Sequence, residues 1–355
     1  MAAPFTLVIP VINERDGLSR ILPELGSAAV IIVDDGSSDG TKELAGKFDN
    51  VSLFERGRKG GLVSACLYGM KKALETGAEY IAVMDGDGQH DPSYLDKMVR
   101  AAKAERADLV LGSRYLGGKG SGWEGVSRSR RLISRVANYI FRLSFGSQPA
   151  DVTTGLRVYS REAAELLLAE PPTMGSYAGQ VEIVEKLRRA GMKIMEYPIV
   201  FRKRVNGESK LSIVDIINYY LFVLTKGNLW KYTVVGLSGV LVNELALWAL
   251  APVNLFAADL VAIELSVTSN FLLNERWTFR RRVTEGETRT VGWRLVHHNL
   301  YSLAGLAINF LTFSVLTLAG MNPLLSNLFG IAAAFLFRYA KPLGPVWVEM
   351  GDRSS

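Results

Sequence analysis

Residues 295–337 contain no aspartate, glutamate, lysine or arginine. A domain that folds in water does not normally leave 43 consecutive residues without a charge, because charged side chains occupy much of its surface. A second stretch, residues 232–273, contains three acids and no basic residue. The sequence therefore predicts a membrane domain in its C-terminal third, and a wholly soluble enzyme is excluded.

Four apolar segments in this region are about 20 residues long, the length at which a helix crosses the ~30 Å hydrocarbon core of a bilayer. They cover residues 232–251, 255–274, 299–319 and 323–340. Basic residues are concentrated in the connection 275–294 and just outside the first and last segments, whereas the other two connections carry no charge. By the positive-inside rule, this distribution predicts an integral multi-pass membrane protein with both termini in the cytoplasm.

Residues 211–227 lead into the first segment and place apolar side chains at positions 213, 214, 217, 220, 221 and 224. This spacing is typical of one face of a helix. An amphipathic helix with basic ends beside a membrane span is expected to lie in the membrane interface. A surface helix packed on a soluble domain has the same pattern, so both alternatives stay open.

The first 210 residues alternate short apolar runs with helical segments, which predicts α/β units and a parallel sheet covered by helices. Strands are expected at residues 5–10, 30–33, 51–54, 80–84 and 108–111, and helices at about 16–26, 39–48, 60–76 and 92–104. Ligands bind such sheets beyond the carboxyl ends of the strands. Functional residues are therefore expected directly after strands.

Acidic residues follow three of these expected strands. The strands lead into Pro10-Val11-Ile12-Asn13-Glu14, Asp34-Asp35-Gly36 and Asp85-Gly86-Asp87-Gly88-Gln89. Carboxylates at i and i+2 on an extended chain point to the same side, and such an oxygen-rich pair suits Mg²⁺ or Mn²⁺ held together with substrate phosphates. The net charge of +6 fits anionic substrates, and no nucleic-acid partner is expected because the basic residues lie near membrane boundaries and in possible phosphate-binding positions.

These motifs, in this order and spacing, resemble the GT-A domain of family 2 glycosyltransferases, and in particular polyprenyl-phosphate sugar transferases such as dolichyl-phosphate mannose synthase. The resemblance extends through Arg56-x-x-Lys59-Gly60-Gly61-Leu62, Gly112-Ser113-Arg114-Tyr115, Asp151-Val152-Thr153-Thr154-Gly155-Leu156-Arg157 and Arg204-Val205-Asn206-Gly207-Glu208-Ser209-Lys210. The C-terminal half resembles the four-helix GtrA-like membrane domain, notably in Asn274-Glu275-Arg276-Trp277-Thr278-Phe279. The implied fold class is an α/β GT-A domain, Rossmann-like with a mostly parallel sheet, followed by an all-α four-helix transmembrane domain.

The resemblance also implies roles for individual residues on the donor side. Asp85, Asp87 and Gln89 would hold Mg²⁺ or Mn²⁺ on the diphosphate of a nucleotide sugar, with Asp87 and Arg204 as the catalytic pair. Arg204 and Lys210 flank a glycine-containing loop that would close over the diphosphate. The whole expected donor-binding set is Pro10, Ile12, Glu14, Asp35, Lys59, Asp85, Gly86, Asp87, Gln89, Arg204 and Lys210.

The implied acceptor is a polyprenyl (dolichyl-type) phosphate. Arg114 and the pair Arg130 and Ser134 are expected to bind its phosphate, because residues four apart on a helix share a face. A cationic stripe lying on anionic lipid headgroups is the structural alternative for this segment. Three neighbouring residues compete for the same role: Arg128, Arg131 and Arg135.

The resulting functional hypothesis is transfer of a single hexose, with mannose from GDP-mannose favoured, to polyprenyl phosphate on the cytoplasmic membrane face with inversion. A UDP-glucose or other UDP-sugar transferase stays open, because Gly86 stands where the commoner mannose-synthase pattern has alanine. Flipping of a lipid-linked sugar by the membrane domain also stays open. The expected domains are 1–210 (catalytic), 211–227 (interfacial helix), 228–345 (membrane domain) and 346–355 (cytoplasmic tail).

Overall fold

The computed structural model describes residues 5–343 except 58–59, 118–119, 146–148, 176, 205–211, 251, 254 and 280–289. The chain divides into two compact units, of which the first comprises Met1–Arg142 and Ser147–Phe222 and the second Leu143–Gly146 and Val223–Ser355. Each unit has a hydrophobic core of its own.

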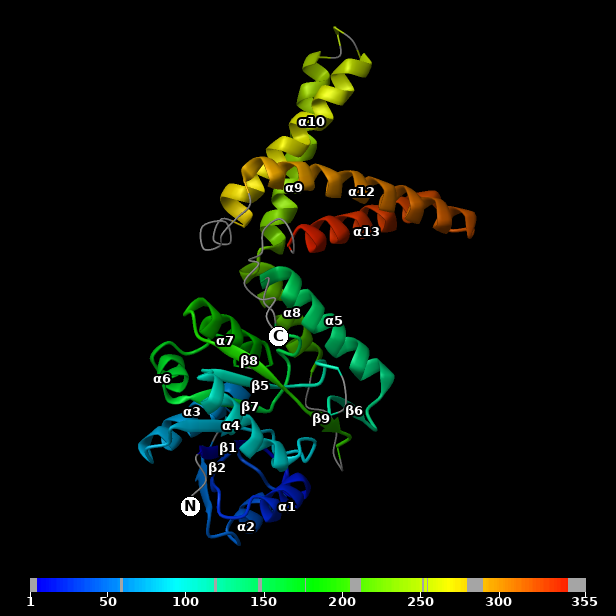
Figure 1. The fold of residues 1–355 in the computed structure, drawn as a ribbon. Helices are drawn as coiled ribbons and strands as arrows, with labels where there is room; N and C mark the ends of the chain where they lie inside the picture. The colour runs from blue at the N-terminus through cyan, green and yellow to red at the C-terminus, as the bar shows by residue number, and fades with distance from the viewer. Residues whose placement is uncertain are drawn as a thin grey trace. The chain divides into compact units, whose positions relative to one another are not determined.

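A seven-stranded sheet forms the centre of the first unit, in the order β3-β2-β1-β4-β7-β5-β8 (Figure 1). Strand β7 is antiparallel to both of its neighbours, and the other adjacent pairs are parallel. A short parallel pair, β6 with β9, forms a second sheet. The strands are β1 (Phe5–Val11), β2 (Ala29–Asp34), β3 (Val51–Glu55), β4 (Tyr80–Val83), β5 (Leu109–Ser113), β6 (Gly122–Glu124), β7 (Arg157–Ser160), β8 (Ile194–Pro198) and β9 (Val200–Arg202).

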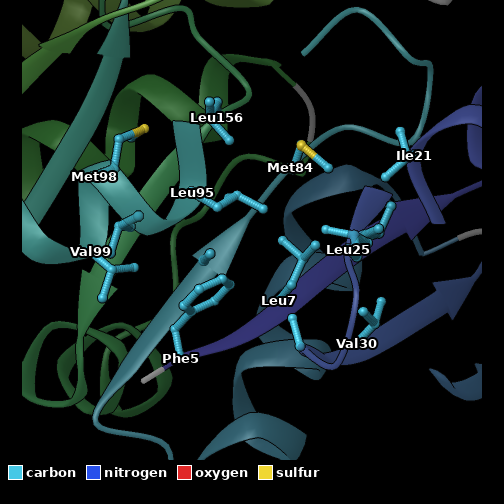
Figure 2. Close-up of a cluster of buried hydrophobic side chains, with 14 of the residues drawn as sticks. Phe5, Leu7, Ile21, Leu25, Val30, Met84, Leu95, Met98, Val99 and Leu156 are labelled. Atoms are coloured by element: carbon cyan, nitrogen blue, oxygen red, sulfur yellow. The ribbon is translucent and has the colours of Figure 1, made fainter. Parts of the chain in front are cut away.

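Helices pack against the central sheet because its strands are apolar on both sides. Leu7 of β1 and Val30 of β2 lie in one cluster with Leu95 and Met98 of α4, as Figure 2 shows, whereas Val8 of β1 contacts α3 at the place where Gly69 leaves room for it. The helices of this unit are α1 (Arg15–Glu24), α2 (Thr41–Ala45), α3 (Leu62–Glu75), the 3₁₀ turn η1 (Pro92–Tyr94), α4 (Leu95–Glu105), α5 (Arg128–Phe145), α6 (Arg161–Ala169), α7 (Tyr177–Arg189) and α8 (Ile213–Lys226). Helices α5 and α8 extend into the second unit at their C-terminal ends.

Helix α8 corresponds to the predicted amphipathic segment. Its packed side carries Tyr219, whose hydroxyl donates a hydrogen bond to the carbonyl of Ala137 in α5 at 2.6 Å. The predicted apolar stripe lies elsewhere on the helix, and Ile213, Val214 and Ile217 in it are more than half exposed. Tyr220, in the same stripe, is half-buried. Helix α8 therefore packs on the first unit on one side and leaves most of the predicted stripe exposed.

The second unit is helical throughout the described part of the chain. It contains α9 (Leu229–Leu250), α10 (Leu255–Leu273), its π-helical continuation η2 (Asn274–Thr278), α12 (Val291–Leu318) and α13 (Pro323–Leu343). By length and composition, α9 and α12 can cross a membrane, and α13 contains a shorter apolar segment, Leu328–Tyr339. The predicted fold class is confirmed: a mostly parallel α/β domain is followed by a region of apolar helices.

Glycines in this unit leave room for polar side chains of neighbouring helices. A Cβ at Gly239 of α9 would overlap the amide group of Asn270 in α10, and one at Gly330 of α13 would overlap the amide oxygen of Asn309 in α12. A Cβ at Gly305 of α12 would lie 2.7 Å from the Arg338 side chain of α13. Small residues of this kind allow membrane helices to approach closely without a hydrophobic driving force.

Candidate active site

A cavity of about 400 Å³ opens at the carboxyl ends of β1, β2 and β4. These three strands are adjacent and parallel, so the residues that follow them meet at one sheet edge, as expected for this class of fold. The cavity brings together eight of the predicted donor-binding residues: Pro10, Ile12, Glu14, Asp35, Asp85, Gly86, Asp87 and Arg204. The other lining residues include Gly61, Tyr177 and Asp215.

Asp85 and Asp87 form the acidic end of this cavity. Burial, reinforced by the neighbouring Asp87 carboxylate, raises the pKa of Asp85 to about 7. Gly155 lies directly against the Asp85 carboxylate, where a Cβ would overlap it. Gly17 in the first turn of α1 likewise gives the Gly86-Asp87 backbone room to approach. Gly17 and Gly155 thus leave room for the carboxylate pair, which a Cβ at either position would overlap or displace.

This donor set fits a hard divalent cation, because both ligands are carboxylate oxygens and their mutual repulsion is removed when a cation lies between them. In the described part of the chain, no group of three or more His, Cys, Asp or Glu side chains could hold a metal ion. Two carboxylates would therefore leave most of the coordination sphere to substrate phosphates and water, which is the usual arrangement for Mg²⁺ in phosphate chemistry.

Gln89, the third expected metal ligand, does not line the cavity with the two aspartates. It is 1% exposed, its Nε2 donates to the carbonyl of Arg202 at 2.8 Å, and its Oε1 accepts from Arg130 at 3.4 Å. Its backbone N–H donates to Asp87 Oδ1 at 3.0 Å. In this conformation Gln89 therefore orients Asp87 through its backbone, while its side-chain hydrogen bonds hold it outside the cavity.

Arg204 closes one side of the cavity through two ion pairs. Its guanidinium lies 2.8 Å from Asp87 Oδ2 and 3.2 Å from Glu14 Oε1. Burial alone would lower the pKa of Arg204. The hydrogen bond and the negative charge of Asp87 outweigh burial, so the pKa of Arg204 is raised. The same Asp87 oxygen cannot serve Arg204 and a metal ion equally well, so these two cations compete for it.

Asp35 lines the cavity, but its own hydrogen bonds are directed at the following loop. Arg56 lies 2.5 Å from its Oδ1, and the N–H groups of Gly60 and Gly61 donate to its Oδ2 at 3.2 and 3.1 Å. Asp35 therefore shapes the cavity wall at least as much as it offers an acceptor to a ligand. Lys59, in the same loop, and Lys210 lie outside the described residues.

A second, smaller cavity of about 140 Å³ contains the three predicted acceptor residues Arg114, Arg130 and Ser134. The remainder of its wall is largely apolar and aromatic, with Trp123, Ile133, Tyr219 and Tyr220 among the lining residues. Tyr177 and Asp215 line both cavities. A phosphate attached to a hydrocarbon chain matches this mixture of cations and apolar surface.

Arg114 lines this cavity but is also held by the loop that follows α5. The residue is 8% exposed, and its guanidinium makes two 2.6 Å hydrogen bonds to Asp151 and one of 2.8 Å to Thr153. Burial alone would raise the pKa of Asp151, but the neighbouring Arg114 charge outweighs burial and holds that pKa below its usual value. The Nε and Nη2 groups of Arg114 therefore hold the 151–153 loop, and Arg130 is the arginine of the predicted set that lines the cavity from an exposed position.

Asn138 connects this ion pair to α5. Its Nδ2 donates to the carbonyl of Ser134 at 2.9 Å, and its Oδ1 accepts from the N–H of Val152 at 2.8 Å. The hydroxyls of Ser134 and Thr153 lie 3.2 Å apart. The helix that carries Arg130 and Ser134 is therefore held to the loop that follows α5 by buried polar contacts.

No motif in the sequence singles out Tyr177, Gly17 or Asn138. Tyr177 begins α7, far along the chain from the acidic motifs, and no spacing relates it to them. Gly17 lies inside a helix, where glycine usually signals weak helix formation rather than a close contact. The Arg204 ion pairs were equally hidden, because they join residues 190 and 117 positions apart.

Comparisons with known proteins match both units. The family described as "Glycosyl transferase family 2" matches residues 6–168, and "GtrA/DPMS, transmembrane domain" matches residues 231–341. A dolichol-phosphate mannosyltransferase from Pyrococcus furiosus is 32% identical over 356 residues, which cover 94% of this chain and 96% of that protein.

Two further relatives match a shorter part of the chain. A polyprenol monophosphomannose synthase from Mycolicibacterium smegmatis is 34% identical over 216 residues, or 58% of this chain and 80% of that protein. An undecaprenyl-phosphate mannosyltransferase from Micrococcus luteus is 34% identical over 214 residues, or 58% of this chain and 86% of that protein.

Proposed function

Because the chain belongs to the polyprenyl-phosphate mannosyltransferase-like enzymes of glycosyltransferase family 2, with a GtrA/DPMS transmembrane domain, we propose that it transfers one mannose from GDP-mannose to a polyprenyl phosphate. The observation that carries the proposal is the pair of cavities that share Tyr177 and Asp215. One offers acidic and cationic groups to a metal-bound diphosphate, and the other offers Arg130 and apolar surface to a lipid phosphate.

In the proposed reaction, an oxygen of the acceptor phosphate attacks the anomeric carbon of the donor sugar. A new C–O bond forms, the bond to the diphosphate breaks, and its electron pair leaves with the nucleoside diphosphate. Attack on the face opposite the leaving group inverts the anomeric configuration. Mg²⁺ or Mn²⁺, when bound at Asp85 and Asp87, would neutralise charge on the leaving diphosphate.

Arg204 supplies the chain's own cation for that charge. It is paired with Asp87 and Glu14, and we expect it to exchange these carboxylates for the diphosphate when the donor and its metal bind. A planar guanidinium binds phosphate oxygens through two parallel hydrogen bonds, so the exchange keeps its donors satisfied.

No protein general base is needed for this acceptor. A phosphate monoester loses its second proton with a pKa of about 6, so its attacking oxygen is already largely anionic at neutral pH. Two carboxylates of the first unit have other contacts: Glu14 pairs with Arg204 at 3.2 Å, and Glu182 accepts hydrogen bonds from the N–H groups of Thr173 and Met174 at 2.9 and 3.0 Å. Both are proposed to bind or pack rather than to remove a proton.

Turnover at saturating metal is expected to rise with pH as the acceptor phosphate ionises and then to level off. The apparent pKa should lie below that of the free monoester, because Arg130 favours the charged form. The measurement is a kcat profile at saturating acceptor, which reports ionisation in the bound complex, with the natural acceptor and with a phosphonate analogue of different second pKa. The pH at which turnover rises should shift with the second pKa of the acceptor. If the profile did not shift when the acceptor is changed, and one carboxylate variant lost the pH dependence, a protein base would be required.

Arg130→Gln is expected to raise the KM for polyprenyl phosphate by on the order of tenfold, the usual effect of losing one charge-assisted hydrogen bond, with little change in the KM for the donor. Arg128→Gln is the matched control, because Arg128 is an exposed arginine of the same helix that does not line the cavity. Steady-state kinetics with each substrate varied in turn separate the two effects. Equal acceptor KM values in the two variants would remove Arg130 from the acceptor site.

The membrane side and the domain limits also belong to this proposal. The arginines of the 275–294 connection and the basic residues beside α9 and α13 support a cytoplasmic catalytic domain by the positive-inside rule. We propose the limits 1–210, 211–227, 228–345 and 346–355 for the catalytic domain, interfacial helix, membrane domain and tail. Protease digestion of sealed, oriented vesicles tests the side: the catalytic domain should be cleaved only from the cytoplasmic face.

Purified full-length protein, Mg²⁺, polyprenyl phosphate and a panel of labelled nucleotide sugars test the reaction itself. GDP-mannose is expected to give a labelled mannosyl phosphodiester lipid in which the anomeric carbon of the mannose has the inverted configuration. Preferential labelling by UDP-glucose or another UDP-sugar would replace the donor assignment, and no transfer from any donor would leave lipid-sugar flipping as the remaining hypothesis.

A further inference from the structure

A cavity of about 520 Å³ lies among the helices of the second unit. Its lining residues belong to that unit alone, and none of them lines the two cavities of the first unit. All four long helices of the unit contribute to it, together with η2. The polar lining residues used below are Glu244, Asn270, Asn274, His298, Ser302 and Arg338.

Within the part of the chain that the structure describes, two amides of this cavity have a side-chain oxygen without a hydrogen-bond partner. Asn274 is 2% exposed, and its Oδ1 is buried without a hydrogen-bond partner. The Oδ1 of Asn270 is buried and without a partner as well, although Gly239 gives this side chain its place between α9 and α10. A buried amide left unpaired is unfavourable in a protein and more so where no water reaches it. Both amides therefore point to a polar ligand in the cavity.

Arg338 provides the charge of the site. It is half-buried on α13, and among the described residues no carboxylate lies within ion-pair distance of its guanidinium, whose Nε makes only a 3.4 Å contact with the carbonyl of Ala334. Cations on membrane helices normally pair with an anion or reach water. Glu244 lines the same cavity, and its charge disfavours a ligand with two negative charges.

We propose that this cavity binds the headgroup of a phosphodiester lipid that carries hydroxyl groups. A phosphodiester has a single negative charge, which Arg338 would pair, and its hydroxyls would bond the amides of Asn270 and Asn274 and the carboxylate of Glu244. Two sources have this chemistry: a hydroxylated membrane phospholipid such as phosphatidylglycerol, and the glycosylated polyprenyl phosphate that the proposed function would produce. The second source rests on the proposed function; the site itself does not.

Native mass spectrometry of the full-length protein, titrated with phosphatidylglycerol or with phosphatidylcholine, measures this binding. The wild-type protein should retain phosphatidylglycerol in preference to phosphatidylcholine, whose headgroup has no hydroxyl. Arg338→Gln should weaken retention of phosphatidylglycerol by on the order of tenfold, the usual effect of losing a charge-assisted pair. Lys231→Gln is the control, because Lys231 lies over the ring of Trp277 and does not line the cavity.

Asn274→Leu keeps the test decisive if Arg338→Gln fails to fold, which circular dichroism would reveal. It should lower the preference for phosphatidylglycerol over phosphatidylcholine while Lys231→Gln leaves it unchanged. Competition with mannosyl phosphoryl polyprenol then identifies the source: displacement of phosphatidylglycerol at lower concentration assigns the site to the product, and its failure to displace assigns it to membrane phospholipid. Equal retention of the two phospholipids by the wild type, or unchanged retention in both cavity variants, would overturn the proposal, whatever the enzyme's donor proves to be.

Discussion

Replacing Asp87 by asparagine is expected to lower sugar transfer by on the order of a thousandfold, the scale reached when an active site loses an electrostatic group directed at developing charge. The fold should persist, because asparagine has the same shape and keeps an oxygen for the N–H of Gln89. What is lost is the negative charge that pairs with Arg204 and that is proposed to hold a divalent cation.

The comparison for this variant is Asp96→Asn, since Asp96 is an exposed aspartate in the first turn of α4, away from the cavity. Initial rates at several Mg²⁺ concentrations, with circular dichroism of both proteins, make the measurement. A folded Asp87→Asn protein with turnover near that of Asp96→Asn would remove Asp87 from the catalytic assignment.

Gly155→Ala is expected to lower kcat/KM by at least about a hundredfold, because a displacement of about 1 Å in an active site can lower the rate by that factor. The added Cβ would overlap the Asp85 carboxylate, so either the carboxylate or the loop that carries residue 155 must move. Both movements disturb the proposed metal ligands without removing any of them. The concentration of Mg²⁺ needed for half-maximal activity should therefore rise together with the loss of rate.

Gly46→Ala is a suitable control for that substitution, since the added Cβ would meet the nearest atom at 3.6 Å, an ordinary contact. Metal titrations of both variants by activity, and of donor binding by calorimetry, separate a displaced metal site from general damage. If Gly155→Ala kept the Mg²⁺ dependence of the wild type, the close packing at Asp85 would have no functional meaning.

The positions of Glu14, Asp35, Asp85 and Asp87 were predictable because the carboxyl ends of neighbouring parallel strands must meet at one edge. That argument uses only strand order and alternation, which apolar runs reveal. The same reasoning could not predict β7, which lies antiparallel between β4 and β5. Its four residues do not indicate whether the strand runs parallel or antiparallel to its neighbours.

Prediction from the sequence was also limited by side-chain contacts between residues that lie far apart in the chain. Arg114 was expected to face a ligand, and only the folded chain reveals Asp151 beside it, 37 residues away in sequence. Gln89 follows the same rule, since the hydrogen bond that holds its side chain outside the donor cavity goes to a carbonyl 113 residues away. A motif identifies which residues lie near a site, whereas their orientation depends on neighbours that the motif does not contain.

The glycines that accommodate polar groups in the second unit restrict which sequences this membrane domain can adopt. On a lipid-facing helix surface, one apolar side chain replaces another at little cost, so substitutions there should be well tolerated. At Gly239, Gly305 and Gly330 even a methyl group would collide with the side chain of Asn270, Arg338 or Asn309, and at Gly330 it would also lie 2.8 Å from the backbone oxygen of Asn309. A lone alanine at position 239 or 305 would therefore displace the neighbouring polar side chain, whereas one at position 330 would have to separate α12 from α13.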